Sequence, residues 1–525
     1  MVEINDRRLP VGIQSFEVIR EGGYLYVDKT DIIWQLANRD KKYNYLSRPR
    51  RFGKSVLVDT LEAYFLGKKE LFEGLKIMQM ETEWVKRPVI RLDMSRAGAA
   101  PESVRSYLDN AFHQLESEYD IAVRQDSSLA DRFDAIIQTA YNKTGLQVAI
   151  LIDEYDSPLQ HSWKTPQHEA CTAVYREVFA ILKADDKYEK FVFITGITKF
   201  TQISLFSVLN NLSNISFEPN YAAICGITKE EVLRDFKPEI NKLAAKNDWN
   251  LDEAVAQLAA YYDGYHFCHE NMVDVFNPFS LINALADSKL KNYWASSGAT
   301  STLPKFVDNM ELKLRNFDPC TILRQTIETS DVTGGGAELF LYQSGYLTIK
   351  GYQMGVYILG FPNSEVRQAL YETVLPALTL RGNSDIQSIQ SDLLLAIQLG
   401  NLPEAMKCLK ALIADVPYSN KKLASMDMEE RYRLIMSTIF NAIGCRVEVE
   451  KMIATGRIDM VVETTQYIYV LELKLSDNGG VDAAAEQIRA KQYAEPFKAD
   501  KRKVIALAIE LDDRGKGLVD WKEVF

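Results

Sequence analysis

Apolar runs separated by longer amphipathic segments dominate residues 1–225. The runs at 43–46, 148–152 and 191–194 are continuous rather than alternating, which indicates strands buried on both faces. A further strand is expected over 87–93. Because segments of helical pattern lie between these runs, the sequence predicts an α/β domain with a doubly wound parallel sheet.

The middle of the chain has a different pattern. From residue 226 to about residue 420 it is rich in aromatic residues and largely helical in periodicity. Short apolar runs at Leu339–Tyr342 and Tyr346–Lys350 are strand-like and follow a glycine-rich turn at 333–337. Residues 375–420 have the spacing of two amphipathic helices. We therefore predict a mainly helical middle region that ends in a helical spacer.

Two apolar strands joined by a short turn are expected near the C-terminus. Residues 458–463 and 467–474 flank the turn at 464–466. Pairing in a hairpin brings together positions whose numbers have a constant sum, here about 930. Asp459 and Glu472 sum to 931, so we expect these two residues to be neighbours.

The same hairpin predicts a cluster of charged side chains. Side chains alternate faces along a strand, so Glu472 and Lys474 point the same way while Leu473 points into the core. Two close carboxylates, Asp459 and Glu472, repel each other unless a hard cation such as Mg²⁺ binds between them. Such a cation can activate water and polarise a phosphodiester, and the Lys474 ammonium can orient that water or neutralise charge on phosphorus. The cluster therefore favours metal-dependent phosphodiester cleavage, with a charged hairpin of no chemical role as the alternative.

A second candidate site follows the apolar run at 43–46. It reads Arg48-Pro49-Arg50-Arg51-Phe52-Gly53-Lys54-Ser55 and precedes a helical run at 56–66. Strand, loop and helix in this order are typical of a phosphate-binding loop, in which Lys54 reaches the β- and γ-phosphates and the Ser55 hydroxyl binds Mg²⁺. Arg48 stands at the usual first glycine, so the loop geometry is expected to differ from the common form.

Acidic residues are expected at the same edge of that sheet. Asp153 and Glu154 directly follow the strand at 148–152, and ligands of open α/β sheets bind beyond the carboxyl ends of the strands. Asp153 can therefore hold the Mg²⁺ shell while Glu154 polarises the attacking water. Thr195 ends the next strand and is a candidate sensor of the γ-phosphate, and Asp156 is a third local acid.

Four spaced motifs make the N-terminal region resemble the AAA-ATPase-like family. They are Tyr26-Val27-Asp28-Lys29-Thr30, Arg48-Pro49-Arg50-Arg51-Phe52-Gly53-Lys54-Ser55, Ile152-Asp153-Glu154-Tyr155-Asp156 and Tyr262-Asp263-Gly264-Tyr265. The resemblance implies ATP and Mg²⁺ as cofactors. It also implies a lid or winged-helix-like unit after the nucleotide-binding domain.

Residues 425–525 resemble the PD-(D/E)xK nuclease superfamily, in the version fused to an ATPase-like domain in many bacterial proteins. The resemblance rests on the hairpin, an alanine-rich helix and a final strand at 503–511. It implies a restriction-endonuclease-like α/β domain and a nucleic-acid substrate, DNA or RNA. Its implied site residues are Asp459 and Glu472 as metal ligands, Lys474 as the catalytic lysine, Gln487 as an accessory polar group, and Glu429 and Glu450 as further acids.

The length and the charge of the chain bear on the number of its domains and on nucleic-acid binding. A chain of 525 residues exceeds what one core normally sustains. The net charge of −11 opposes indiscriminate binding to polyanions, yet residues 421–525 hold 17 Lys and Arg against 18 Asp and Glu. Lys498, Lys501, Arg502 and Lys503 could form a local basic face or only a solvated loop. We expect four regions: 1–225, 226–374, 375–424 and 425–525.

Other features exclude some classes. No apolar run approaches the ~18 residues that span a bilayer, and Met1–Pro10 is charged rather than signal-like. These observations favour a cytoplasmic protein without membrane contact. Six cysteines without paired spacing argue against a disulfide framework.

The sequence thus predicts an enzyme with two sites. It is expected to bind and hydrolyse ATP and so control a Mg²⁺-dependent nuclease domain. The alternative is a nucleotide-dependent switch whose C-terminal region binds nucleic acid or protein without cleavage. Arg50 and Arg51 could contact the nucleotide, nearby acids or another subunit, and the last role would require a homo-oligomer, which the sequence leaves open.

Overall fold

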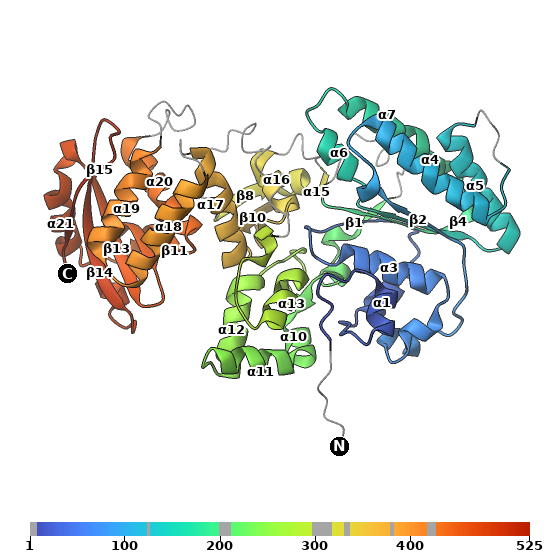
Figure 1. The fold of residues 1–525 in the computed structure, drawn as a ribbon, viewed down its shortest axis with the longest axis horizontal. Coiled ribbons are helices and arrows are strands. Elements are labelled where there is room, and N and C mark those ends of the chain that lie inside the picture. The colour runs from blue at the N-terminus through green and yellow to red at the C-terminus, as the bar shows by residue number, and fades with distance from the viewer. Residues whose placement is uncertain are drawn as a thin grey trace, which may run out of the picture. The chain divides into compact units, whose positions relative to one another are not determined.

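The computed structural model describes residues 8–122, 127–198, 212–296, 318–329, 336–378, 383–416 and 427–525. Contacts divide the chain into two compact units (Figure 1). The first unit is Met1–Tyr293 with Phe317–Asn363, and the second is Trp294–Asn316 with Ser364–Phe525. Each unit is described below by itself.

A five-stranded parallel sheet forms the centre of the first unit. Its strand order is β2-β3-β4-β1-β5, and every neighbouring pair is parallel. The predicted parallel sheet is therefore confirmed. The strands are β1 (Tyr43–Ser47), β2 (Val89–Asp93), β3 (Val148–Asp153), β4 (Glu189–Gly196) and β5 (Ser213–Asn214). Every residue of β3 is buried, as its continuous apolar run predicts.

Helices lie on both sides of this sheet, with α1 and α3 on one side and α4 to α7 on the other (Figure 1). Phe112 and Phe133 stack between two of them with ring centroids 5.2 Å apart. The helices are α1 (Phe16–Glu21), α2 (Thr30–Ala37), α3 (Lys54–Phe65), α4 (Pro101–Glu118), α5 (Leu129–Thr144), α6 (Ser157–Ser162), α7 (His168–Phe179) and α8 (Ile181–Ala184).

A carboxyl group is buried at the start of β4. Glu189 has no exposed surface, and the Tyr43 hydroxyl donates to its Oε2 at 2.7 Å. Its Oε1 finds no hydrogen-bond partner among the described residues. Burial, helped by the nearby Asp185 and Asp186, raises the pKa of Glu189 from 4.5 to about 8 against the opposing effect of the Tyr43 hydrogen bond.

This pKa shift predicts a pH-dependent stability. Above pH 4.5 the unfolded chain releases the Glu189 proton while the folded chain keeps it until about pH 8, so folding stability falls as the pH rises through this window. Glu189→Gln cannot release a proton. Relative to wild type, we expect it to gain about 3 kcal/mol more at pH 8 than at pH 5.5, measured by urea unfolding. Glu177→Gln is the control. It removes an exposed ion pair with Arg105 and should show the same pH dependence as wild type. Equal pH profiles for all three proteins would contradict the raised pKa of Glu189.

The rest of the first unit is a helical layer followed by a small sheet. Helices α10 (Lys229–Asp235), α11 (Lys237–Lys246), α12 (Leu251–Tyr262) and α13 (Pro278–Asp287) share one apolar core. The short strands β6 (Ile227–Thr228) and β7 (Val275–Phe276) pair beside them. The elements that follow are β8 (Cys320–Leu323), α15 (Arg324–Thr329), α16 (Gly336–Gln343), β9 (Thr348–Gln353) and β10 (Val356–Gly360), with the antiparallel order β8-β10-β9.

One predicted strand in this layer is wrong. Leu339–Tyr342 belongs to helix α16, in which Leu339, Phe340 and Leu341 are buried. The run has no β-branched residue and is flanked by Glu338 and Gln343, which favour helix. The glycine-rich turn expected before it lies outside the described residues except for Gly336 and Ala337, which begin the helix.

The second unit joins helices to a mixed five-stranded sheet. Its helices are α17 (Ser364–Leu378), α18 (Asn383–Gln398), α19 (Leu402–Ala414), α20 (Met428–Ala442) and α21 (Gly480–Ala490). The strands follow chain order in the sheet: β11 (Arg446–Ile453), β12 (Gly456–Glu463), β13 (Tyr467–Leu475), β14 (Lys503–Leu511) and β15 (Leu518–Glu523). Only β13 and β14 are parallel. The buried Ala484 and Ala485 let α21 pack closely on this sheet.

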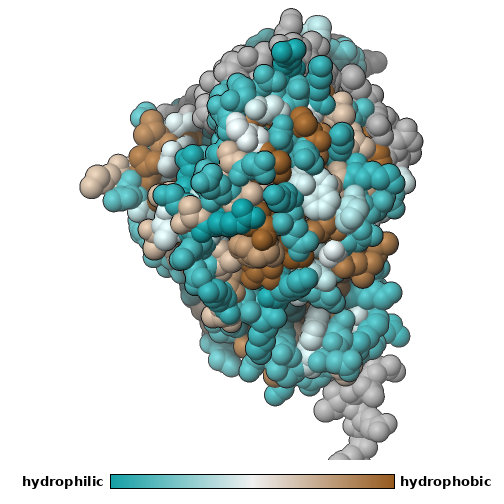
Figure 2. Space-filling model, turned by 90° about the vertical axis from the view of Figure 1, so that its left-hand side faces the viewer, coloured by the Kyte–Doolittle hydropathy of each residue, from teal (hydrophilic) through white to brown (hydrophobic). Residues whose placement is uncertain are grey.

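The predicted hairpin is confirmed, with its register. Met460 pairs with Leu471 and Val461 with Val470, so the paired numbers sum to 931. The face of the molecule shown in Figure 2 is largely hydrophilic, with apolar side chains gathered in patches. Within the described ranges, none of the helices combines the length and apolarity that crossing a membrane requires.

Candidate functional site

The loop between β1 and α3 has two residues in the left-handed backbone region. Gly53, which caps α3, has φ 86°, and Arg51 has φ 68°. Glycine adopts this conformation without steric cost, whereas arginine does so at a cost. Arg48, which replaces the usual first glycine, is not in this region. The loop therefore accommodates arginine at position 48 without the backbone strain that its position suggested.

The Arg48 side chain points into the protein. It is 1% exposed, and its guanidinium donates to the carbonyl oxygens of Ser47, Ser216 and Tyr221 at 2.9–3.0 Å. It also lies 4.1 Å from the ring centre of Phe267. The side chain is thus committed to anchoring the loop. The Arg48 backbone is also engaged, because its nitrogen donates to the Gly196 carbonyl at 3.3 Å and its own carbonyl accepts from Lys54.

Phe52 forms the second anchor of the loop. Its buried ring contacts Tyr265 and Phe267 edge to face, with centroid distances of 4.6 and 5.4 Å. The motif at 262–265 therefore packs beneath the phosphate-loop motif. Arg50 lies with a guanidinium nitrogen 3.4 Å from the Gln160 amide oxygen, and the Arg51 guanidinium is 5.1 Å from the ring centre of Phe279.

The structure brings Lys54, Ser55 and Asp153 together as predicted. The Lys54 ammonium donates to the carbonyl oxygens of Arg48 and Pro49, both at 3.1 Å. Burial raises the pKa of Asp153, while the nearby Lys54 and Ser55 side chains lower it. A lysine, a hydroxyl and a carboxyl group thus meet where β1 and β3 end.

The other predicted residues of this site differ in their burial and in their hydrogen-bond partners. Glu154 is half-buried and has φ 48° directly after β3. The Thr195 hydroxyl donates to the Leu46 carbonyl at 2.9 Å inside the sheet, so its proton is already committed. Asp156 Oδ2 accepts hydrogen bonds from the backbone nitrogen and the hydroxyl of Thr198, both at 2.6 Å. Asp156 therefore fixes the turn after β4.

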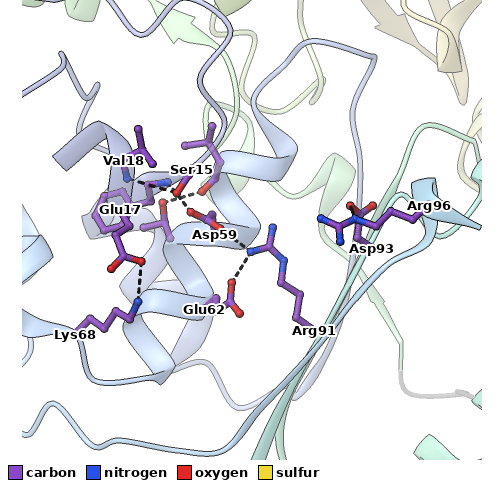
Figure 3. A network of polar contacts seen from close by, with 12 residues as sticks. Ser15, Glu17, Val18, Asp59, Glu62, Lys68, Arg91, Asp93 and Arg96 are labelled. Carbon is purple, nitrogen blue, oxygen red and sulfur yellow. Dashed lines mark hydrogen bonds and ion pairs between the residues drawn. The ribbon is translucent and has the colours of Figure 1, made fainter. Parts of the chain in front are cut away.

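A polar network fixes helix α3, whose first residues are Lys54 and Ser55 (Figure 3). Arg91 on β2 forms ion pairs with Asp59 and Glu62, and the backbone nitrogen of Phe16 donates to Asp59. Two residues further along β2, Asp93 is the register partner of Asp153. The network thus fixes helix α3 relative to strand β2, whose last residue Asp93 lies beside Asp153.

In the second unit, Asp459, Glu472 and Lys474 form the predicted cluster. Asp459 is 5% exposed, and its Oδ2 accepts a hydrogen bond from the Leu473 nitrogen at 2.9 Å. The Lys474 ammonium lies 3.3 Å from Glu472 Oε1. Burial and the neighbouring Asp459 raise the pKa of Glu472 to about 8, against the lowering effect of Lys474. The two carboxylates share one side of the hairpin, as the register predicts.

The donor set fits a hard divalent cation. Glu472 is fully buried, and neither of its carboxylate oxygens has a hydrogen bond of good geometry in the described part of the chain. A buried carboxylate without such bonds is costly unless something compensates its charge. Oxygen ligands at paired carboxylates are what Mg²⁺ prefers. Ser55 and Asp153 offer an oxygen donor set of the same kind in the first unit.

Gln487 lies at the edge of the cluster. Its amide nitrogen donates to the Tyr493 hydroxyl at 3.0 Å, and that hydroxyl donates to the Arg457 carbonyl at 2.7 Å. Burial raises the pKa of Tyr493, as do the nearby Glu472 and Asp459, against the lowering effects of Gln487 and Lys474. Tyr493, which follows the helix that carries Gln487 and fixes the orientation of its amide, is not among the residues predicted from the sequence.

Glu429 and Glu450 both reach the cluster through Arg433, a residue that the sequence reading missed. Arg433 Nη1 lies 2.5 Å from Glu450 Oε1 and 3.7 Å from Asp459 Oδ1, and Nη2 lies 4.0 Å from Glu429 Oε1. Burial and Asp459 raise the pKa of Glu429. The only sequence signal for Arg433 was its position four residues after Glu429, which places both on one helix face.

These two arrangements define the class of the protein. A parallel sheet whose strand ends gather a lysine, a serine and an aspartate is an ATPase-like feature. A mixed sheet that carries two close carboxylates and a lysine is a nuclease-like feature.

Comparison with known proteins supports both assignments. Residues 10–206 match the family model described as predicted AAA-ATPase, and residues 427–521 match that of the PD-(D/E)XK nuclease superfamily. A protein of Azotobacter chroococcum mcd 1, described as an uncharacterized protein in vnfD 5'region, is 32% identical over 542 positions, which cover 98% of each chain. The chain belongs to the family of predicted AAA-ATPases with a C-terminal PD-(D/E)XK nuclease superfamily domain.

Proposed function

We propose that this protein is an ATP-binding and ATP-hydrolysing enzyme that controls a Mg²⁺-dependent nuclease acting on DNA or RNA. The observation that carries the proposal is the fully buried Glu472, which lies beside Asp459 and Lys474 without a hydrogen bond of good geometry among the described residues. The Lys474 ion pair offsets only part of the cost of burying this carboxyl group beside Asp459, because the pKa of Glu472 is still raised to about 8. The arrangement is useful where a cation binds.

In the nuclease domain, each side chain has a distinct part in the proposal. Asp459 and Glu472 would hold Mg²⁺, which supplies Lewis-acid activation of water when bound. Asp459 keeps one oxygen on the Leu473 nitrogen, so its carboxylate is fixed in orientation. Lys474 neutralises charge that develops on the scissile phosphate. Gln487, fixed by Tyr493, positions substrate at the rim.

In the ATPase-like region, the phosphate-binding group would be Lys54 with the backbone N–H groups of residues 50–53, since Pro49 has no N–H and the Arg48 nitrogen donates to Gly196. The Lys54 ammonium now contacts two neutral carbonyl oxygens, and an anionic phosphate is a stronger partner for it. Ser55 and Asp153 would hold Mg²⁺, and Glu154 would orient the attacking water. Because the Thr195 hydroxyl already bonds to Leu46, Thr195 can sense the γ-phosphate only if that bond breaks.

The test compares wild type with Asp459→Asn. Both proteins are incubated with Mg²⁺ and labelled single- and double-stranded DNA and RNA, with and without ATP, and the products are separated on a gel. We expect Mg²⁺-dependent cleavage by wild type and none by Asp459→Asn, because the amide removes the charge that binds the cation. Binding of nucleic acid without cleavage on all four substrates would instead support the nucleotide-dependent switch.

A further inference from the structure

Arg433 is the cation nearest to the Asp459 carboxylate. Among the described residues, no other side-chain cation forms an ion pair with Asp459, and Lys474 pairs with Glu472 instead. The separation of 3.7 Å between Arg433 Nη1 and Asp459 Oδ1 is an ion pair but too long for a hydrogen bond. Arg433 is 8% exposed, so water screens this attraction only weakly.

The oxygen that faces Arg433 is the one that a metal would use. Asp459 Oδ2 is already bonded to the Leu473 nitrogen, which leaves Oδ1 as the carboxylate oxygen with no hydrogen bond to the backbone. A guanidinium and a divalent cation cannot both lie against one small carboxylate without strong repulsion. Arg433 and a bound metal therefore compete for the same charge.

Glu450 is the closer partner of Arg433. The distance from Arg433 Nη1 to Glu450 Oε1 is 2.5 Å, and Glu450 also pairs with Arg457 at 3.0 Å. The pairs on either side of Glu450, at Val449 and Lys451, place it opposite Asp459 in the β11–β12 register. A second carboxylate thus lies beside the first and holds the guanidinium by a hydrogen bond.

We propose that Arg433 is the resident counter-cation of the metal-free nuclease site and that Glu450 holds it clear of Asp459 when a metal binds. Arg433 is then a positioning residue that sets metal affinity. The inference rests on the proposed function, since it assumes that Asp459 and Glu472 bind a divalent cation. In the absence of metal, Arg433 offsets repulsion among Asp459, Glu450 and Glu429. With metal bound, the Arg433 guanidinium pairs with Glu450 and no longer with Asp459.

The experiment measures Mn²⁺ affinity of the full-length protein by calorimetric titration without nucleotide. Asp459→Asn serves as the blank, so that only binding at this site is counted. Arg433→Gln is expected to bind Mn²⁺ about 10-fold more tightly, because one competing charge near the carboxylate is gone. The matched control is Arg457→Gln. This substitution also removes a positive charge that pairs with Glu450, but among the described residues Arg457 forms no ion pair with Asp459. It is expected to change the affinity less than about 2-fold.

A double-mutant cycle tests the role of Glu450. Glu450→Gln alone is expected to weaken Mn²⁺ binding, because the released guanidinium moves onto Asp459. In the Arg433→Gln background the same substitution should change affinity less than about 2-fold, since no guanidinium is left to release. Thermal unfolding checks each variant, and Arg433→Met replaces Arg433→Gln if the latter does not fold.

Each outcome is decisive. Equal tightening in Arg433→Gln and Arg457→Gln would mean that only bulk charge matters, and weaker binding in Arg433→Gln would mean that Arg433 supports the ligands. Either result overturns the inference, as does a Glu450→Gln effect that persists without Arg433. If wild type binds Mn²⁺ through Asp459 but Arg433 has no effect, the proposed function stands and the inference fails. If wild type shows no Asp459-dependent binding, both fail.

Discussion

Replacing Lys474 by alanine is expected to slow phosphodiester cleavage by about 1,000-fold, because one preorganised positive group at a developing charge is worth about 10²- to 10³-fold in rate. The Lys474 ammonium is 3.3 Å from Glu472 and its side chain is only 22% exposed, so it acts where water screens charge weakly. Single-turnover cleavage of an end-labelled substrate at saturating Mg²⁺ measures the effect.

Metal binding separates this role from a structural one. Lys474→Ala removes a positive charge beside the two carboxylates, so Mn²⁺ affinity should be unchanged or tighter while cleavage is lost. Lys407→Ala is the control, since Lys407 lies in the same unit and forms an exposed ion pair with Glu404. A Lys474→Ala variant that cleaves within about 3-fold of wild type would show that the lysine is dispensable, and would remove it from the proposed mechanism.

Lys54→Ala is expected to weaken ATP binding by about 10- to 100-fold, the loss of one charge-assisted contact to phosphate. Lys54 is 4% exposed and points back at the carbonyl oxygens of Arg48 and Pro49, so its ammonium is already inside the loop. Titration with a fluorescent ATP analogue in the presence of Mg²⁺ gives the affinity. Lys143→Ala, at an exposed ion pair with Asp120 on the same unit, should bind as wild type does.

The same variant tests whether the two sites are coupled. If nucleotide controls cleavage, Lys54→Ala should cleave at one rate with and without ATP, while wild type changes its rate on addition of ATP. Unaltered ATP affinity in Lys54→Ala would exclude the loop as the nucleotide site. Loss of ATP binding together with an unchanged response of cleavage to ATP would show that a different element senses the nucleotide.

Elements with a strong local signal could be predicted from the sequence. The run at 148–152 is apolar at every position because both faces of β3 are buried. An uninterrupted apolar run can be recognised in the sequence alone. The register of β12 and β13 followed from the turn length and the fixed two-residue period of a strand. Asp459 and Glu472 were therefore placed side by side without knowledge of the remaining sheet.

Features that depend on distant segments could not be predicted. Arg48 looked like a residue of the nucleotide site, but carbonyl groups at residues 216 and 221 bind its guanidinium. Arg433 looked like an ordinary helix arginine until β11 and β12 brought Glu450 and Asp459 to it. Helix α16 was misread because a short apolar run carries no period long enough to separate helix from strand.

The anchor at Arg48 has a consequence for how this loop can vary among related proteins. Its hydrogen bonds go to main-chain oxygens of Ser47, Ser216 and Tyr221, and every amino acid supplies such an oxygen. The three partner positions can therefore change their side chains without removing the acceptors, so the anchor constrains the identity of one residue only. Loss of the arginine, in contrast, removes a hydrogen-bond donor from all three carbonyl oxygens at once, and no side-chain substitution at the partner positions changes those oxygens.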